Sequence, residues 1–431
     1  MKPRKINHSQ STFFEQRLSD MLNLDHGLIK LSENIDWGNI EEEIGGIFTT
    51  NKGRPPVPVR TIVGLLMLQH MFGLSDDSVV FNWVENPYWQ YFCGYDFFQH
   101  EFPIDPSSLS RWRRRIGEKE LIKLLMHTVK TAKKTKMIQA NSIKRVIADT
   151  TVMEKNVFYP TDARLYQRGI FTLVKMAKIY EISLRQTYIR LSKKALLRAN
   201  RYCHARQMKR AKKEIKRLKT YLGRVTRNIK RAIQNSRELQ FYFSEILPII
   251  DKLLVQTRES KDKIYSIHEP KVECISKGKV HKKYEFGCKV SFVSTHREGI
   301  ILSAQAIHGN PYDGHTLKKV IEDAENVAQT EINSIFVDRG YRGSEIKEKK
   351  IYISGQKRLT RYFKKLLRRR QSIEPHIGHM KQDGKLGRNY LKGIHGDKLN
   401  ATLSGVGHNL RLILNHLSPK YRKKAFIPNI S

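Results

Sequence analysis

Two short apolar runs, 189 residues apart in the chain, each end in an aspartate. Val146-Ile147-Ala148 precedes Asp149, and Ile335-Phe336-Val337 precedes Asp338. Short apolar runs rich in β-branched and aromatic residues are typical of buried strands. The chain is therefore expected to form an α/β fold in which two distant segments become strands of one sheet.

A third acid, Glu374, lies in a strongly basic segment that begins near Arg358. The 431-residue chain holds 80 lysines and arginines against 41 acidic residues, a formal net charge of +39. A cationic excess of this size indicates a polyanionic partner rather than a fold, and nucleic acid is the partner that we expect. A ribosome-associated or merely adhesive protein is the alternative. In such a chain, isolated carboxylates at strand ends are candidate functional groups.

The order of the predicted elements is that of a ribonuclease-H-like sheet. The elements are a strand at 143–149, a hairpin of strands at 284–293 and 300–307, a helix at 313–328, strands at 332–338 and 351–354, and a basic helical region from 358 onward. Asp313 is the expected N-cap of the helix. If the first and fourth strands are adjacent, Asp149 and Asp338 lie side by side at one edge of the sheet. Glu374, on a helix, would close over them.

A long basic helical insertion interrupts this sheet between residues 164 and 257. Apolar residues from Met208 to Ala232 recur at alternating spacings of three and four, the pattern of a helix packed along a partner. A similar pattern from Leu173 to Ala195 predicts a second long helix, so that the two form an antiparallel hairpin. Residues 190–231 hold 17 lysines and arginines but a single acid. We interpret this surface as a contact with the DNA backbone, and a solvated coiled-coil face is the alternative.

The segment before the sheet is expected to form an all-α DNA-binding domain. Strongly apolar positions from Val59 to Gly73 predict one helix, and Ser75 is the expected N-cap of the next. Asp105 and Pro106 begin a short helix that ends near Gly117. Its four arginines give it the character of a helix-turn-helix recognition element: Arg111, Arg113, Arg114 and Arg115. A solvated basic surface helix is the alternative.

These features predict five segments. They are an N-terminal helical DNA-binding domain at 1–135, the first part of the catalytic domain at 140–160, the basic insertion at 164–257, the remainder of the catalytic domain at 265–415, and a C-terminal tail at 416–431. No apolar stretch is long enough to span a bilayer. The N-terminus lacks the apolar core of a signal peptide, and the four cysteines are scattered. We expect a soluble protein with reduced thiols and no membrane partner.

The three acids predict metal-dependent phosphodiester chemistry. Carboxylates gathered at one sheet edge repel one another, which raises their pKa values unless cations are bound. Mg²⁺ prefers oxygen ligands, and a pair of such ions activates the attacking oxygen and stabilises the leaving one. Asp149, Asp338 and Glu374 are therefore the expected catalytic and metal-binding residues. They would hold two Mg²⁺ ions, for which Mn²⁺ would substitute.

Each acid also has a simpler interpretation. Asp149 also suits a solvent-facing strand end, Asp338 a turn before Gly340, and Glu374 an ion pair with Arg370. Asp162 is the substitute if the assignment of Asp149 is wrong. The remaining candidates lie before and within the predicted hairpin: His268, Glu269 and His281 as metal ligands, and Lys282, Lys283 and Lys289 as residues of a phosphate-facing surface.

Several motifs together resemble the DDE transposases of bacterial insertion sequences, most closely the IS-five group. They lie between about residues 55 and 415 and are Asp105-Pro106-Ser107-Ser108-Leu109, Asn310-Pro311-Tyr312-Asp313-Gly314-His315-Thr316-Leu317, Asp338-Arg339-Gly340-Tyr341-Arg342-Gly343, Arg370-x3-Glu374-x6-Lys381 and Ile373-Glu374-Pro375-His376-Ile377-Gly378-His379-Met380-Lys381. The combined set is specific, whereas a single motif is not. The family's tyrosine, expected three residues before Arg370, is replaced by Leu367.

The resemblance implies roles for the matching residues. Asp149, Asp338 and Glu374 would form the metal-binding triad, and Arg370 and Lys381 would contact DNA phosphate near the scissile bond. Arg339 and Arg342, in the same motif as Asp338, are expected DNA contacts as well. The protein would bind the terminal inverted repeats of an insertion sequence, hydrolyse a phosphodiester, and use the freed 3′-hydroxyl to attack target DNA. It would work as a homodimer on double-stranded DNA, in the cytoplasm with the bacterial nucleoid, and without a nucleotide cofactor.

Two other functions fit the same sequence. The first is a catalytically silent DNA-binding protein derived from a transposase, which would bind DNA in a salt-sensitive way without nicking it. The second is a structure-selective nuclease of the same fold, which would cut junctions without strand transfer.

Overall fold

The computed structural model describes residues 16–46, 57–276, 283–346 and 348–418. The chain divides into two compact units. Residues 1–154 and 288–431 form the first, called the sheet unit below, and residues 155–287 form the second, the helical unit. The part of the predicted N-terminal helical domain before residue 16, and the part of the predicted C-terminal tail after residue 418, lie outside the described residues.

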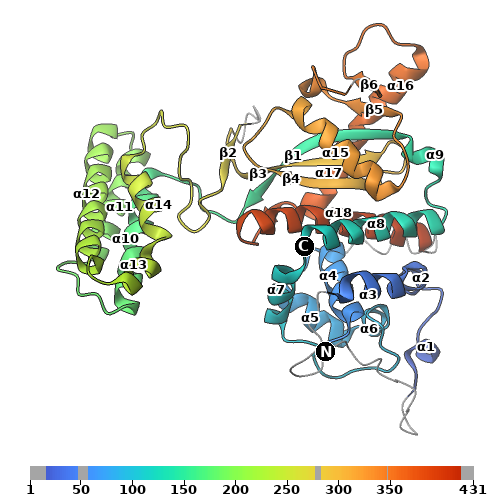
Figure 1. Cartoon of the computed structure of the whole chain (residues 1–431), viewed down its shortest axis with the longest axis horizontal. Helices are drawn as coiled ribbons and strands as arrows, with labels where there is room; N and C mark the ends of the chain where they lie inside the picture. The colour runs from blue at the N-terminus through green and yellow to red at the C-terminus, as the bar shows by residue number, and fades with distance from the viewer. Residues whose placement is uncertain (1–15, 47–56, 277–282, 347, 419–431) are drawn as a thin grey trace. The chain divides into compact units, whose positions relative to one another are not determined.

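The sheet unit is a mixed α/β structure (Figure 1). Its helices are α1 (Leu18–Met21), α2 (Gly27–Asn34), α3 (Trp37–Gly45), α4 (Val59–Phe72), α5 (Asp76–Glu85), α6 (Pro87–Phe92), α7 (Pro106–Arg115), α8 (Glu118–Lys134), α9 (Ala140–Ile143), α15 (Asp313–Ala328), α16 (Arg361–Arg369), α17 (Ile373–Gln382) and α18 (Gly393–Leu417), with 3₁₀ turns η1 (Arg339–Tyr341) and η2 (Arg370–Ser372). Its strands are β1 (Arg145–Lys155), β3 (Glu285–Thr295), β4 (Ile301–Ile307), β5 (Ser334–Val337), β6 (Lys350–Ile353) and β7 (Arg388–Asn389).

The sheet brings together strands from both sides of the helical unit in sequence. The strand order is β3-β1-β5-β6, with β4 on the outer edge of β3 and β7 pairing with β1. β1 pairs with β5 and β5 with β6 in parallel, whereas β3 and β4 form an antiparallel hairpin. The expected neighbourhood of the first and fourth strands is therefore confirmed, although Asp149 and Asp338 are 189 residues apart in the chain.

The two faces of the sheet contribute to different cores because side chains alternate along a strand. Val146 and Ala148 of β1 belong to the larger core, which includes the apolar side of α15. Ile147 of β1 and Phe336 of β5 belong to a second core, which includes Ile377 of α17. This alternation decides which helix the next residues of β1 face.

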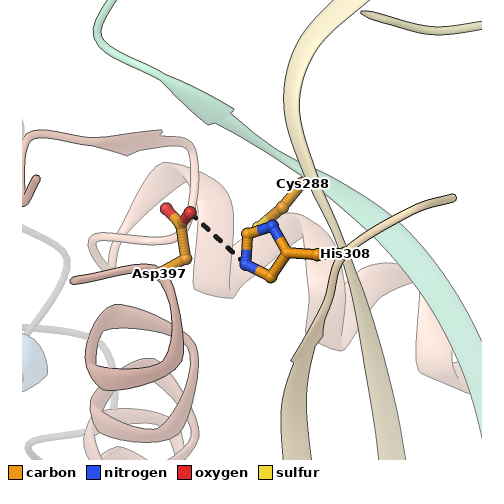
Figure 2. Close-up of side chains that lie close together, drawn as sticks. All are labelled: Cys288, His308 and Asp397. Atoms are coloured by element: carbon orange, nitrogen blue, oxygen red, sulfur yellow. Dashed lines mark ion pairs between the residues drawn. The ribbon is translucent and has the colours of Figure 1, made fainter. Parts of the chain in front are cut away.

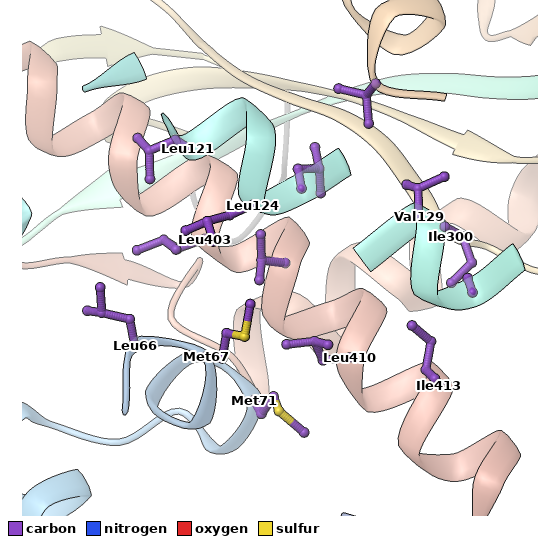
Figure 3. Close-up of a cluster of buried hydrophobic side chains, with 14 of the residues drawn as sticks. Leu66, Met67, Met71, Leu121, Leu124, Val129, Ile300, Leu403, Leu410 and Ile413 are labelled. Carbon is purple, nitrogen blue, oxygen red and sulfur yellow. The ribbon is translucent and has the colours of Figure 1, made fainter. Parts of the chain in front are cut away.

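Helix α18 is the centre of the larger core (Figure 3). The labelled side chains around it include Leu66, Met67 and Met71 of α4, Leu121, Leu124 and Val129 of α8, and Ile300 just before β4. Arg411 of α18 also donates from Nη1 to the carbonyl oxygens of His70, at 3.1 Å, and Met71, at 3.0 Å. The N-terminal helices thus share one hydrophobic core with the helices that cover the sheet.

The helix ends of this region follow local chemistry. Gly73 ends α4 with a φ of +68°, a left-handed conformation that glycine adopts without strain. Ser75 caps α5 by accepting from the backbone N–H of Ser78, and Asp105 caps α7 by accepting from that of Ser107. The predicted ends of these helices at Gly73, Ser75 and Asp105 are confirmed.

The helical unit is built on an apolar stripe. Its elements are α10 (Asp162–Ile179), α11 (Ile189–His204), α12 (Met208–Ile233), α13 (Arg237–Phe243), α14 (Ile246–Val255) and the short strand β2 (Glu273–Ile275), which pairs with the start of β3. Leu218, Leu222 and Ile229 of α12 are fully buried, as the alternating spacing predicts. The single upstream helix expected from Leu173 to Ala195 is wrong. The chain leaves the helix after Ile179, with Glu181 and Tyr188 at positive φ, so α10 and α11 are separate helices.

Candidate active site and cationic surfaces

Asp338 directly follows β5, and Asp149 lies within β1, beside the point where its parallel neighbour β5 ends. The expected end of the first strand at Asp149 is wrong, because β1 continues to Lys155. The last registered pair between β1 and β5 is Ile147 with Phe336, and each aspartate lies two residues beyond it. Both members of that pair face the core of α17, so the alternation along β1 turns Asp149 to the same side. Asp338 accepts a hydrogen bond from the backbone N–H of Gly340 at 2.9 Å, which fixes its carboxylate at the strand end.

Arg370 joins the first acid to the third. Its Nη1 lies 3.5 Å from Oδ2 of Asp149, and its Nη2 lies 3.6 Å from Oε1 of Glu374. The side chains of Arg370 and Asp149 are 11% and 15% exposed, whereas that of Glu374 is 64% exposed. The structure therefore brings Asp149 and Glu374 within reach of one partly buried cationic group, with Glu374 on the solvent side.

Pro375 does not separate Arg370 from Glu374. Helix α16 ends at Arg369, the η2 turn follows, and α17 begins at Ile373, which places Pro375 in the first turn of α17. In a first turn the missing proline N–H removes no intrahelical hydrogen bond. The spacing of four residues consequently keeps the Arg370–Glu374 pair, and Lys381 lies in the last turn of the same helix.

Asp313 is a fourth acid at this edge, and the N-cap expected there is wrong. Tyr312 occupies the N-cap position of α15, and Asp313 is the first helical residue. Its Oδ2 accepts from the hydroxyl of Thr150 at 3.1 Å, and its Oδ1 accepts from Nζ of Lys289 at 2.9 Å. The carboxylate is used in tertiary contacts, one of them to the residue after Asp149. The signal available in the sequence was the Asn310–Leu317 motif, which contains Asp313.

Lys289 serves this acid rather than a phosphate-facing surface. The lysine is buried, and its Nζ also donates to the carbonyl oxygen of Pro311 at 2.7 Å. A buried ammonium needs such partners because desolvation of an isolated charge is costly. The expectation that Lys289 faces phosphate is therefore wrong, and its charge instead offsets that of Asp313.

The buried phenol of Tyr341 shows that three of the acids converge. Burial raises the pKa of Tyr341 well above its usual range, and the negative charges of Asp149, Asp313 and Asp338 raise it further. Asp338 and Asp313 also approach Gly340 together: a Cβ added to that glycine would lie 3.1 Å from Oδ1 of Asp338 and 3.5 Å from Oδ2 of Asp313. The acidic edge is therefore built around a neutral tyrosine.

The donor set suits a hard divalent cation. Asp149, Asp338 and Glu374 offer carboxylate oxygens, the ligands that Mg²⁺ prefers. Grouped carboxylates repel one another, and a bound cation would offset that repulsion. Arg370 already spans two of these acids with one positive charge, so these two are placed to share a cation. On these grounds the residues present fit a divalent metal.

The four arginines of α7 have different environments. Arg113 is buried, pairs with Asp76 of α5, and donates from Nη1 to Oε1 of Gln69 of α4 at 3.2 Å. Arg111, Arg114 and Arg115 are exposed. The guanidinium of Arg113 therefore attaches α7 to the core, and only the other three can face a ligand.

The remaining predicted DNA contacts lie near the acidic edge. Arg339 and Arg342 are exposed in and directly after η1, next to Asp338. Leu367, at the position of the family's tyrosine, packs against the core of α17. Tyr362, five residues earlier, accepts from Nη1 of Arg145 at 2.6 Å. In the structure, Leu367 therefore has a packing role, and Tyr362 is hydrogen-bonded to Arg145.

The alternative metal candidates have partners of their own in the helical unit. His268 hydrogen-bonds with Ser266 at 3.0 Å, and Glu269 lies 3.5 Å from Nζ of Lys155. His281 and Lys282 lie outside the described residues, and Lys283 is exposed. Asp162, the substitute for Asp149, is the first residue of α10.

The helical unit presents a broad cationic surface. On α12 the apolar stripe faces the core, while the basic residues face solvent: Lys209, Arg210, Lys212, Lys213, Lys216, Arg217, Arg224, Arg227, Lys230 and Arg231. The one acid of α11 and α12, Glu214, is buried and accepts from Arg217 at 2.6 Å. We call the exposed cations of α11 and α12 the helical cationic face.

Comparison with known proteins gives two family matches. Residues 16–115 match a transposase domain, and residues 243–405 match a transposase DDE domain. The second match includes Asp313, Asp338 and Glu374 but begins after Asp149. An uncharacterised protein, ORF8 in the nfe locus of Rhizobium meliloti, is 45% identical over 207 residues, which is 48% of this chain and the whole of that relative. No solved structure matches, and none of the described helices has the length and apolar character needed to cross a membrane.

Proposed function

Because the chain belongs to the DDE transposases of insertion sequences, we propose that it binds the terminal inverted repeats of its own element and carries out Mg²⁺-dependent cleavage and strand transfer. The family acts on DNA and uses divalent metal ions. The assignment to the IS-five group rests on the motifs around Asp105, Asp313, Asp338 and Glu374.

The observation that carries the proposal is the bridge made by Arg370. One guanidinium contacts Asp149 from β1 and Glu374 from α17, and β1 is the parallel neighbour of the strand that ends at Asp338. Three acids from three distant segments reach one edge of the sheet, beside a buried arginine. A cluster of carboxylates with cationic groups around it is the arrangement that metal-dependent phosphodiester cleavage requires.

In this proposal Asp149, Asp338 and Glu374 would hold two Mg²⁺ ions, which would supply Lewis-acid activation of the attacking oxygen and stabilise the leaving one. Arg370, released from the two acids, turns its guanidinium to the scissile phosphate, a group that arginine binds through two hydrogen bonds. Lys381 binds a neighbouring phosphate. Water is the first nucleophile and the freed 3′-hydroxyl the second, so no covalent intermediate with the protein forms.

Asp313 is a positioning residue in the same scheme. Its charge is offset by Lys289, and its other oxygen holds the hydroxyl of Thr150, next to Asp149. The salt bridge keeps a fourth negative charge from adding to the repulsion at the edge. Asp313 therefore holds Thr150, the residue of β1 that follows Asp149.

The architecture supports a division of labour along the chain. The strand order β4-β3-β1-β5-β6, with its hairpin and three parallel strands, favours a ribonuclease-H-like catalytic domain formed by residues 140–160 and 265–415. The helical unit is then an insertion, with residues 164–257 holding the DNA backbone through the helical cationic face. Residues 1–135 read the DNA ends, with Arg111, Arg114 and Arg115 as contacts and Arg113 left out. Arg339 and Arg342 contact DNA beside the acids, and two copies join the two ends.

One assay tests this proposal. Labelled DNA carrying the ends of the encoding element is incubated with the full-length protein, Mg²⁺ and a target plasmid. The wild type should cleave the ends and join them to the plasmid. Asp149→Asn, Asp338→Asn and Glu374→Gln should bind the DNA but not cleave it, because each loses a carboxylate. Asp162→Asn is the matched control and should retain activity.

The same assay separates the other functions. Salt-sensitive binding by the wild type with no cleavage would identify a silent DNA-binding protein. Cleavage of branched DNA without joined products would identify a structure-selective nuclease. Loss of cleavage in Asp162→Asn, together with its retention in Asp149→Asn, would overturn the assignment of the first acid.

A further inference from the structure

A second group of metal-ligating side chains lies in the sheet unit and includes none of the residues assigned above. It comprises Cys288 of β3, His308 directly after β4, and Asp397 in the second turn of α18 (Figure 2). The β3–β4 register pairs Lys289 with Ile307, so the antiparallel hairpin places Cys288 opposite His308. Three segments that are distant in sequence thus converge at the end of this hairpin.

The spacing of the three side chains fits one small cation. One ligand atom from each, the Cys288 sulfur, a His308 nitrogen and an Asp397 oxygen, lies within 4.8 Å of the other two. Nε2 of His308 is 3.6 Å from Oδ2 of Asp397. Ligands at tetrahedral Zn²⁺ bond lengths are separated by roughly 3.3–3.6 Å. The histidine and aspartate are therefore already near that separation, and the sulfur is within a small adjustment of it.

The surroundings support the ligand geometry. Asn389 donates from Nδ2 to Oδ1 of Asp397 at 2.7 Å, so that the other oxygen, Oδ2, is turned to His308. Hydrogen bonds of this kind orient metal ligands and are characteristic of built sites. Cys288 and Asp397 are buried, while the side chain of His308 is 21% exposed. The exposed side gives an ion access and leaves room for a water as fourth ligand.

We propose that Cys288, His308 and Asp397 form a zinc site. Thiolate is a soft ligand that Mg²⁺ and Ca²⁺ bind poorly, whereas a set of sulfur, imidazole and carboxylate suits Zn²⁺. Binding releases the thiol proton of Cys288, and the Zn²⁺ charge balances both the thiolate and the Asp397 carboxylate. The site thus differs in chemistry from the all-carboxylate edge at Asp149.

The site would act on the segment that presents Asp313. Cys288 is adjacent to Lys289, which holds Pro311 and Asp313, and His308 begins the same segment. Zinc would therefore fix Cys288, the β3 residue beside Lys289, and His308, the first residue of the loop. It would attach both to α18 through Asp397. Its role is structural: it stabilises the sheet unit and does not take part in the reaction at the acids.

The test is metal binding by the full-length protein. The protein is stripped with a chelator, and titrated with Co²⁺, a coloured substitute for Zn²⁺. One equivalent should produce the thiolate-to-cobalt charge-transfer band in the near ultraviolet, and Zn²⁺ should abolish it. Cys288→Ser should lose the band, and His308→Ala should weaken Zn²⁺ binding at least tenfold. Cys274→Ser, which removes a cysteine outside the site, should bind as the wild type does.

Two results would overturn the proposal. One is the absence of a thiolate band from the wild type at one equivalent of Co²⁺, which needs no variant to fold. The other is unchanged Zn²⁺ affinity in Cys288→Ser and His308→Ala, with circular dichroism equal to that of the wild type. Since Mg²⁺ does not bind thiolate, neither result depends on whether the acids at the sheet edge support cleavage.

Discussion

The sheet unit and the helical unit treat their charged side chains differently. In the sheet unit, Arg113 pairs with Asp76, Lys289 with Asp313, and Arg370 with Asp149, and in each pair the cation is buried. The helical unit has such a pair between Lys155 and Glu269, but many of its described cations are exposed on the helical cationic face. A buried charge requires a partner, whereas an exposed one keeps its water. The net charge of +39 is therefore a poor measure of the surface that a polyanion meets.

The largest difference should be in DNA cleavage, between a variant that loses an acid of the sheet unit and a variant that loses an acid of the helical unit. Asp338→Asn should lower DNA cleavage by at least on the order of 10³-fold, because residues that act as a unit lose most of the rate when one is removed. Asp251→Asn, which removes an exposed partner of Lys230 in the helical unit, should leave cleavage unchanged. Cleavage of labelled DNA ends measures both. Equal losses in the two variants would remove the distinction between the units.

Acid should unfold the sheet unit before the helical unit. Burial lowers the pKa of His70 and of His408 to about 3, and both belong to the sheet unit. In the unfolded chain the two histidines are protonated as the pH falls through about 6.5. Above that pH their contribution to the free energy of unfolding is therefore complete. As the pH falls from 6.5 towards 3, the free energy of unfolding should decrease by up to about 1.4 kcal/mol per pH unit for each histidine.

Urea unfolding between pH 7 and pH 4, followed by limited proteolysis, distinguishes the two units. His408→Gln should reduce the pH dependence of the sheet unit, whereas His204→Gln, at an exposed position of α11, should not. Earlier proteolysis of the helical unit at low pH would contradict this prediction.

Two neighbouring arginines of α7 should separate stability from binding. Arg113→Ala leaves Asp76 without its cationic partner and should lower the free energy of unfolding by about 2–3 kcal/mol, less than for a fully buried pair because Asp76 is partly exposed and keeps the hydrogen bond from Gln69. Arg114→Ala should change stability by less than about 0.5 kcal/mol but weaken DNA binding. Denaturant unfolding and a DNA-binding titration measure the two effects. A stability loss confined to Arg114→Ala would reverse the assignment.

The smallest expected effect concerns the helical cationic face. Replacing Lys213, Lys216 and Arg227 with glutamine should weaken DNA binding and reduce the slope of log K against log salt by about 0.9 for each phosphate that the protein no longer neutralises. The control removes the same charge from the sheet unit, at Lys119, Lys130 and Lys134 of α8. Equal changes in the two triple variants would show that net charge, rather than this face, governs binding.

Features set by local chemistry could be predicted from the sequence. Ser75 and Asp105 cap helices through their own side chains, and β5 ends directly before Asp338, as the apolar run predicts. The end expected at Asp149 is wrong, because β1 continues to Lys155. The role of Asp313, on α15, could not be predicted in this way because it depends on Lys289, 24 residues away on β3. The burial of Arg113, by contrast, could have been predicted from residue spacing. Arg113 lies four residues after the buried Leu109, on the same face of α7.

The break between α10 and α11 could not be predicted from the periodicity of the sequence. The apolar pattern continues through Tyr180 and Leu184, but Glu181 and Tyr188 adopt a left-handed conformation that periodicity does not report. Both residues are ordinary L-amino acids at positions where no glycine or proline marks a turn. Tertiary packing within the helical unit overrides the helical pattern there.

The place of the helical unit between β1 and β3 has a consequence for folding kinetics. During synthesis, β1 emerges long before β5, its parallel neighbour, and parallel pairing across a long separation is slow. A helical unit that folds first replaces most of the intervening chain with one compact body, which lowers the entropic cost of bringing β1 to β5. A ribosome-bound chain that stops before residue 334 therefore exposes the edge of β1 on which β5 belongs, and such edges promote aggregation.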